Sequence, residues 1–201
     1  MKQLLLVRHG LPHEGHATRP GDPPLHPDGR RHAQRLAQQL KREGIDRIVS
    51  SPQQRALDTA APLARLLGLE IEVFDGLAEV DRHTDRYRSV ETLRAEEPQR
   101  WDEFMASPER FFGHEPAAYR AGVVAAYRAI VADPRGTRIA VFTHGMATKT
   151  ILCALLGLPE TRYGLFSIAH CSVSRLSGSA VPGLRVDSVN ESLVSPVRAL
   201  G

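Results

Sequence analysis

The chain has 201 residues, of which 42% are apolar and 24% charged, a composition that excludes collagen-like, coiled-coil and wholly disordered proteins and predicts one globular domain. The formal net charge is +3, and the basic residues are spread along the chain without a basic run. Neither nucleic acid nor a membrane is therefore expected as a partner, whereas a small anionic substrate is compatible with this charge. Only two cysteines (Cys153 and Cys171) and a short apolar run at the start predict a reduced, cytoplasmic protein with no signal peptide or membrane span.

Short apolar runs alternate with helix-period stretches along the first 75 residues. The continuous run at 4–7 is typical of a strand buried on both faces. After Ser51, proline and glutamine follow in a capping-box pattern, so a helix is expected to begin there and to end at Gly68. Together, the patterns predict strands at 4–7, 45–50 and 71–74 and helices at 25–44 and 51–67.

The pattern loosens between 82 and 115, where prolines interrupt it and four aromatic residues supply apolar anchors: Trp101, Phe104, Phe111 and Phe112. We interpret this segment as an inserted, helix-containing flap within the single domain, with the aromatic residues packing under it rather than contacting substrate. Regular patterns return as helices at 117–132 and 146–156 and strands at 138–142, 167–176 and 184–189, with fraying expected from Ser192. This alternation predicts a three-layer α/β/α sandwich with a mainly parallel central sheet.

Polar clusters follow three of the predicted strands, namely Arg8-His9-Gly10, Ser50-Ser51 with Arg55, and Thr143-His144-Gly145. Ligands of open α/β sheets bind beyond the carboxyl ends of the strands, so the clusters are expected to converge on one pocket. Two histidines and two arginines beside helix N-termini describe an oxyanion site, and phosphate is the natural candidate.

Arg55 is placed unfavourably for stability, because the dipole of a helix disfavours a cation in its first turn. A residue that breaks a local rule is a candidate for function. The alternative is a solvated arginine on a helix face, and position alone does not decide between the two.

Together, these clusters resemble the motifs of the histidine phosphatase superfamily, the phosphoglycerate mutase-like proteins. The resemblance runs through 3–155 and rests on Leu5-Leu6-Val7-Arg8-His9-Gly10, Leu25-His26-Pro27-Asp28-Gly29, Ser50-Ser51-Pro52 with Arg55-Ala56, and Val141-Phe142-Thr143-His144-Gly145. It implies that His9 attacks phosphorus to give a phosphohistidine, and that Arg8, Arg55, His144 and Gly145 bind the phosphoryl group. It implies neither a metal nor a cofactor, since the protein itself supplies positive charge.

An acidic residue would protonate the leaving oxygen, and the resemblance favours Glu79 in Gly76-Leu77-Ala78-Glu79. Asp81 and Glu14 are the alternatives. The family's Gly-Trp-Glu-Gly-like stretch is replaced here by 81–87, and Leu11-Pro12 replaces the polar pair that often follows Arg-His-Gly. Both departures leave the wall of the substrate pocket undefined.

Other histidines have simpler interpretations. His13 is expected to be a loop histidine more readily than a substrate contact, and a metal site formed by His9, His13 and His16 lacks a convincing fourth ligand. His170 and Cys171 enter a predicted strand and are interpreted as structural.

The resulting hypothesis is a metal-independent phosphomonoester hydrolase that acts on a small phosphorylated metabolite. A cofactor-dependent phosphoglycerate mutase and a non-catalytic phospholigand-binding module are the alternatives. The sequence does not identify the substrate. It also does not decide between a monomer and a homodimer.

Overall fold

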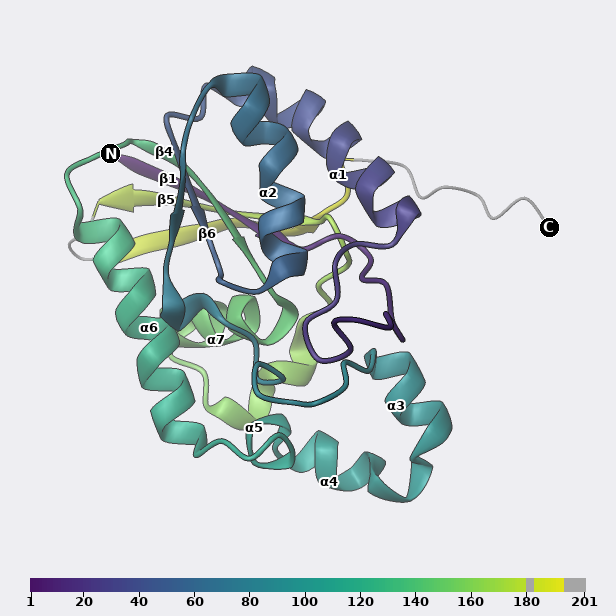
Figure 1. Ribbon diagram of the computed structural model, residues 1–201. Helices are drawn as coiled ribbons and strands as arrows, with labels where there is room; N and C mark the ends of the chain where they lie inside the picture. Colours follow the sequence, from purple (N-terminus) through teal and green to yellow (C-terminus); the bar gives the residue numbers. More distant parts are fainter. Residues whose placement is uncertain (180–182, 194–201) are drawn as a thin grey trace.

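A six-stranded sheet lies at the centre of the computed structural model, which describes residues 1–179 and 183–193 (Figure 1). The strand order is β3-β2-β4-β1-β5-β6, and the first four strands in the chain are parallel whereas β5 and β6 run antiparallel at one edge. The strands are β1 (Lys2–Arg8), β2 (Arg47–Ser50), β3 (Ile71–Val73), β4 (Arg138–Thr143), β5 (Val173–Ser179) and β6 (Gly183–Glu191). The predicted, mainly parallel sheet is confirmed.

Helices cover both faces of the sheet. Helices α1 (Pro27–Leu40) and α2 (Gln54–Leu67) lie on one face, and α6 (Pro116–Ala132) and α7 (Gly145–Leu156) lie on the other (Figure 1). Successive residues of β1 point to opposite faces of the sheet. Leu5 and Val7 pack against α1 and α2, whereas Leu4 and Leu6 pack against α6 and α7. This double burial explains the continuous apolar run and confirms the three-layer architecture.

The start of α2 differs from the capping box expected at Ser51. The helix begins at Gln54, and its backbone N–H is capped from the loop after β1, where Asp22 Oδ1 accepts it at 2.9 Å. The Ser51 side chain does not cap the helix. Its hydroxyl instead forms a hydrogen bond with His144 Nε2, at 2.7 Å. The expected helix end is confirmed, with Gly68 in the left-handed region at φ 67°.

The strand expected at 167–176 begins only at Val173. Before it, Cys171 adopts a positive φ of 56°, and its N–H donates to the Arg8 carbonyl at 3.1 Å. The predicted entry of His170 and Cys171 into a strand is therefore wrong. Both residues lie in a turn held against the end of β1.

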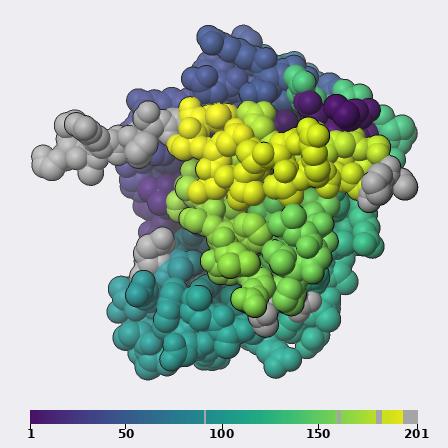
Figure 2. Space-filling view, turned by 180° about the vertical axis from the view of Figure 1, so that it is seen from behind, coloured from purple at the N-terminus to yellow at the C-terminus, as the bar shows by residue number. Residues whose placement is uncertain are grey.

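The segment 82–115 contains three short helices, α3 (Val90–Glu96), α4 (Trp101–Ala106) and α5 (Pro108–Phe111), at the end of the molecule below the sheet in Figure 1. Seen from behind, the teal chain of this segment forms the lower part of the surface and β6, in yellow, crosses the upper part (Figure 2). Phe104 is buried, and its ring lies tilted against Trp101 and edge-to-face with Phe111 and Phe112, at ring-centroid distances of 5.5, 5.6 and 6.3 Å.

Short 3₁₀ turns complete the described chain at Lys41–Glu43, Asp75–Leu77, Pro98–Arg100 and Glu160–Leu165. Among the described helices, none combines the length and apolar character needed to cross a membrane. Most of the tail that is expected to fray from Ser192 lies outside the described residues.

Candidate active site

Two buried histidines face one another beyond the carboxyl ends of β1 and β4. His9 follows β1 directly, and His144 follows β4 and is the N-cap of α7. Their ring centroids are 5.0 Å apart, and only 2% of His9 and none of His144 is exposed. The parallel pairing of β1 with β4 brings these distant residues together, as the strand map predicts.

The imidazole of His9 is held in one tautomer. Its Nδ1 lies 2.8 Å from the carbonyl oxygen of Gly10, which can only accept a hydrogen bond, so Nδ1 carries the proton. Nε2 therefore presents a lone pair to the site. Burial lowers the pKa of His9 well below its usual value, and the nearby Arg55 lowers it further, so the ring is neutral at physiological pH.

Arg55 is fully buried in the first turn of α2, so the solvated alternative is wrong. Its Nη2 donates to Asp81 Oδ1 at 2.6 Å, and its guanidinium lies 4.8 Å from the centroid of the Tyr87 ring. Arg8 is anchored in a similar way, since its Nη1 donates to the Ile168 carbonyl at 2.5 Å. One end of each guanidinium is thus fixed by the protein.

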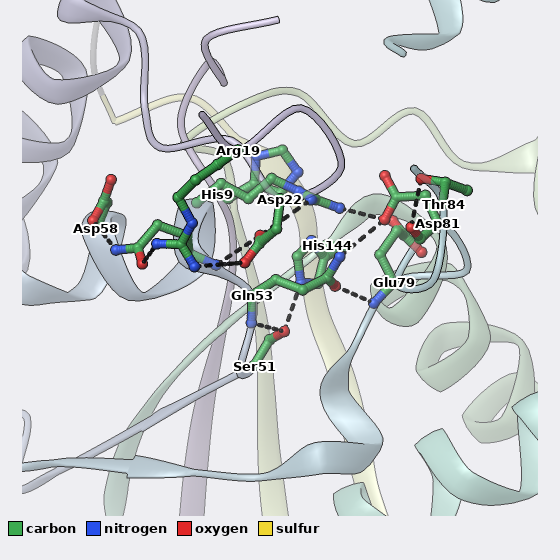
Figure 3. Close-up of polar contacts among 12 residues, drawn as sticks. His9, Arg19, Asp22, Ser51, Gln53, Asp58, Glu79, Asp81, Thr84 and His144 are labelled. Atoms are coloured by element: carbon green, nitrogen blue, oxygen red, sulfur yellow. Dashed lines mark hydrogen bonds and ion pairs between the residues drawn. The ribbon is translucent and has the colours of Figure 1, made fainter. Parts of the chain in front are cut away.

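His144 is oriented by Ser51. The Ser51 hydroxyl oxygen accepts the Gln53 N–H at 3.3 Å, which leaves its own proton free for His144 Nε2 at 2.7 Å (Figure 3). We infer that His144 carries its proton on Nδ1. Burial and the charges of Arg55 and Arg8 lower the pKa of His144 well below its usual value, so the ring is a neutral donor.

A third histidine, missed by the sequence analysis as a site residue, completes this centre. The His170 ring lies 5.2 Å from that of His9, and burial beside Arg8 lowers its pKa to about 3. Its position in the turn paired with the end of β1 could not be read from the sequence, because that segment has the apolar spacing of a strand.

Several buried nitrogens of this centre lack any hydrogen-bond partner within the described part of the chain. They are Arg8 Nε, Arg55 Nε and Nη1, His144 Nδ1 and His170 Nε2. All four residues act electrostatically on the His9 ring, which places them around it. A buried donor without a partner costs about 1–3 kcal/mol, so five of them around one imidazole describe a site for an anion with several oxygens.

Glu79 follows the 3₁₀ turn after β3 and contacts the start of α7. Its Oε2 accepts the Met146 N–H at the start of α7 at 2.9 Å, and its Oε1 accepts the Tyr119 hydroxyl at 3.3 Å. Gln53 fixes the backbone, since its Oε1 accepts the Glu79 N–H at 2.7 Å (Figure 3). Burial, and then the charge of Asp81, raise the pKa of Glu79, as a proton donor near neutral pH requires.

The two alternative acids have other contacts. Asp81 is buried, and its Oδ1 accepts from both Arg55 and Gln53, at 2.6 and 3.0 Å. Glu14 accepts the Ser89 N–H at 3.1 Å and the Thr92 hydroxyl at 3.0 Å, at the N-terminus of α3. Asp81 thus orients a guanidinium and Glu14 holds a helix end, whereas Glu79 alone of the three also lines the large cavity beside Arg8.

Gly145 lies between the acid and the arginine. A Cβ at this position would be 3.7 Å from Arg8 Nε and 3.8 Å from Glu79 Oε2, so a side chain would occupy the space between them. His13 lies away in the first loop, where its ring is 5.3 Å from His16 and 5.6 Å from His26. Over residues 1–179 and 183–193, no group of three or more His, Cys, Asp or Glu side chains has a metal-binding arrangement.

This α/β fold, with a six-stranded and mainly parallel sheet flanked by helices, is the phosphoglycerate mutase-like fold. The chain belongs to the histidine phosphatase superfamily (branch 1), whose family model matches residues 4–190. It is 32% identical to the probable phosphoglycerate mutase GpmB of Yersinia enterocolitica over 96% of this chain and 92% of that protein.

Solved structures share the fold at lower identity. A mycobacterial glucosyl-3-phosphoglycerate phosphatase superimposes with a TM-score of 0.78 at 24% identity, covering 96% of this chain and all of that one. Phosphoserine phosphatase of Entamoeba histolytica, in complex with 3-phosphoglyceric acid, gives a TM-score of 0.71 at 24% identity, with coverage of 96% and 98%.

Proposed function

We propose that this protein is a metal-independent phosphomonoester hydrolase that acts on a small phosphorylated metabolite through a phosphohistidine at His9. The observation that carries the proposal is the set of unpartnered buried nitrogens around a neutral, tautomerically fixed imidazole. Those nitrogens can hold the phosphoryl oxygens while the ring attacks, and phosphoryl transfer demands little beyond such positioning and charge.

In the first step, His9 Nε2 forms a bond to phosphorus as the bond from phosphorus to the ester oxygen breaks. Protonated Glu79 gives its proton to that oxygen, so the alcohol leaves neutral. Water then attacks phosphorus, loses a proton to the Glu79 carboxylate and releases His9 and phosphate. Throughout, Arg8, Arg55, His144 and His170 donate to the phosphoryl oxygens.

A phosphoglycerate mutase would use the same first step and return the phosphoryl group to an organic acceptor. The name carried by the sequence relatives favours this second candidate, whereas the solved structures that share the fold carry phosphatase names. Incubation with 3-phosphoglycerate separates the two reactions, because a hydrolase releases inorganic phosphate and a mutase interconverts phosphoglycerates.

The direct test is hydrolysis of p-nitrophenyl phosphate by protein treated with EDTA. We expect turnover to survive the chelator, because guanidinium and imidazole groups supply the charge. Loss of turnover on chelation, restored by adding a divalent cation, would contradict metal independence. Tight binding of phosphate compounds without any turnover would instead favour a binding module.

The substitution Glu79→Gln is expected to slow hydrolysis of an alkyl phosphate by about 10²–10⁴-fold, because an alkoxide is a poor leaving group without a proton. Hydrolysis of p-nitrophenyl phosphate should fall far less, since nitrophenolate leaves unaided. Burial raises the pKa of Glu79, so alkyl phosphate turnover in the parent protein should fall as pH rises through that value, and the variant should lack this limb.

Steady-state kinetics with both substrates across pH 4–8 measure the effect. Equal, small losses with both substrates would show that another residue protonates the leaving group. Asp81→Asn is the matched variant of the neighbouring carboxylate.

The inserted flap at 82–115, the single-domain organisation, the cytoplasmic location and the homodimer remain predictions.

A further inference from the structure

The two carboxylate oxygens of Glu79 have different neighbours. Oε2 lies at the edge of the phosphate site, since a Cβ placed on Gly145 would be 3.8 Å from it and 3.7 Å from Arg8 Nε. Oε1 instead accepts the Val80 N–H at 3.1 Å and the Tyr119 hydroxyl at 3.3 Å. Oε2 is therefore the oxygen that can exchange a proton with the ester oxygen, whereas the donors at Oε1 stabilise the charge that remains after the proton has left.

The Tyr119 hydroxyl has one proton and two acceptors. Its oxygen lies 3.3 Å from Glu79 Oε1 and also 3.3 Å from the carbonyl oxygen of Ala78, and its single proton can be donated fully to only one of them. A carboxylate is the better acceptor, because a hydrogen bond to an ionised group is about twice as strong as one between neutral groups. A protonated carboxyl loses this advantage. The direction of the Tyr119 O–H bond therefore depends on the charge of Glu79.

Tyr119 itself keeps its proton. It lies on α6, and burial, followed by the negative charge of Glu79, raises its pKa well above the usual value. Tyr163 and Asp81 raise the pKa of Tyr119 further, and the ring of His114 lies 5.9 Å from that of Tyr119. The phenol is therefore a hydrogen-bond donor throughout the reaction rather than an acid.

The other groups around Glu79 do not adapt in this way. The N–H bonds that Val80 and Met146 donate to it belong to the backbone and keep one direction. Charged side chains face Glu79 from its own loop, from α2, from α7 and from the end of β1, namely Asp81, Arg55, Lys149 and Arg8. Asp81 raises the pKa of Glu79 and Arg55 lowers it, and these two side chains are bound to each other at 2.6 Å. Among the described contacts of Glu79, the Tyr119 hydroxyl is thus the one whose hydrogen can turn to a second acceptor.

We infer that Tyr119 is a positioning residue that lets Glu79 serve as the acid in one step and as the base in the next. While Glu79 is protonated, the Tyr119 hydroxyl donates to the Ala78 carbonyl and leaves Glu79 free to give up its proton. Once the alcohol has left, the same hydroxyl turns to Oε1 and stabilises the carboxylate that accepts a proton from water. Tyr119 neither gains nor loses a proton in either step. This inference rests on the proposed function, because Glu79 alternates between its two states in that reaction.

The test is Tyr119→Phe, which removes a donor to the carboxylate and leaves the ring in place. The charged form of Glu79 loses stabilisation, so the alkaline limb of kcat/KM for glycerol 3-phosphate, which follows loss of the Glu79 proton, should move to higher pH by about half to one pH unit. Decay of the phosphoenzyme, followed by rapid quench with p-nitrophenyl phosphate, requires the carboxylate, and its pH dependence should move in the same direction.

Tyr127→Phe is the matched control, because that phenol lies about two turns further along α6, beside the Leu184 backbone. It should move neither pH dependence. A second measurement is the carboxyl carbon resonance of Glu79, titrated by NMR in His9→Ala protein with and without Tyr119→Phe and assigned with Glu79→Gln. Its midpoint should rise by the same amount as the kinetic limb.

An unchanged midpoint, an equal rise with Tyr127→Phe, or a loss of rate that is the same at every pH would overturn the inference and leave Tyr119 a packing role. Failure of the proposed function is distinguishable. It would appear as absent p-nitrophenyl phosphate turnover in the parent protein, whereas the NMR titration needs no turnover.

Discussion

Replacing His9 with alanine should abolish turnover, with kcat/KM for p-nitrophenyl phosphate falling on the order of 10⁴-fold or more. The reason is geometric, because the hydrogen bond from Nδ1 to the Gly10 carbonyl reserves Nε2 for phosphorus. His144 has a different arrangement, since its Nε2 contacts the Ser51 hydroxyl. Acid-labile phosphate on the parent protein, absent from the variant, would identify the intermediate.

The fold of this variant should persist. His9 lies among Arg8, Arg55 and His144 rather than in the apolar core, so its removal leaves a polar cavity that water can fill. Circular dichroism and thermal unfolding check this point. His83→Ala, which removes an exposed histidine from the segment 82–115, is the matched control and should keep normal rates. Near-normal turnover by purified His9→Ala protein would eliminate the nucleophile assignment.

Arg55→Lys should lower kcat/KM by about 10²–10³-fold, the usual loss when one donor to a transition-state oxyanion is removed. The Nη2 of the guanidinium donates to Asp81, whereas its buried Nε and Nη1 have no hydrogen-bond partner within the described chain, with Nη1 3.9 Å from Asp22 Oδ1, and are available to a phosphoryl oxygen. A lysine retains the charge but cannot fork between an aspartate and a phosphoryl oxygen. The loss should therefore exceed what charge alone would predict.

Arg55→Met has a second consequence, for stability. It leaves the Asp81 carboxylate, whose side chain is 7% exposed, with a hydrogen bond from the Gln53 amide but without its cationic partner. The free energy of unfolding should therefore fall by about 3 kcal/mol. Adding Asp81→Asn to Arg55→Met should recover most of that loss without restoring activity. Urea denaturation and kinetics on the same samples separate the effects, with Arg65→Met on the exposed side of α2 as control. If Arg55→Lys were fully active, Arg55 would have a purely structural role.

Much of the fold was predictable because local patterns and tertiary contacts agree. The apolar run before Arg8, the glycines that end two helices and the alternation of elements all reflect constraints that act within a few residues. The candidate site followed from the same map, since His9 and His144 directly follow strands and Arg55 lies in the first turn of a helix. Parallel pairing of β1 with β4 then brings the two histidines together without further information.

The features that could not be predicted depend on contacts between distant segments. Ser51 has the local pattern of a helix cap, yet its hydroxyl is taken by His144, and Asp22 caps α2 instead. His170 has the spacing of a strand residue, but the bond from Cys171 N–H to Arg8 holds its turn beside His9. In each case, a long-range hydrogen bond outweighs a local preference.

The loop after β1 connects parts of the molecule that would otherwise be independent. Asp22 caps the helix that carries Arg55, and Glu14 binds the Ser89 N–H and the Thr92 hydroxyl where α3 begins. Moving α3 away from the sheet therefore breaks contacts to the same loop that sets the first turn of α2. The position of α3 and the first turn of α2, which carries Arg55, are therefore coupled through this one loop.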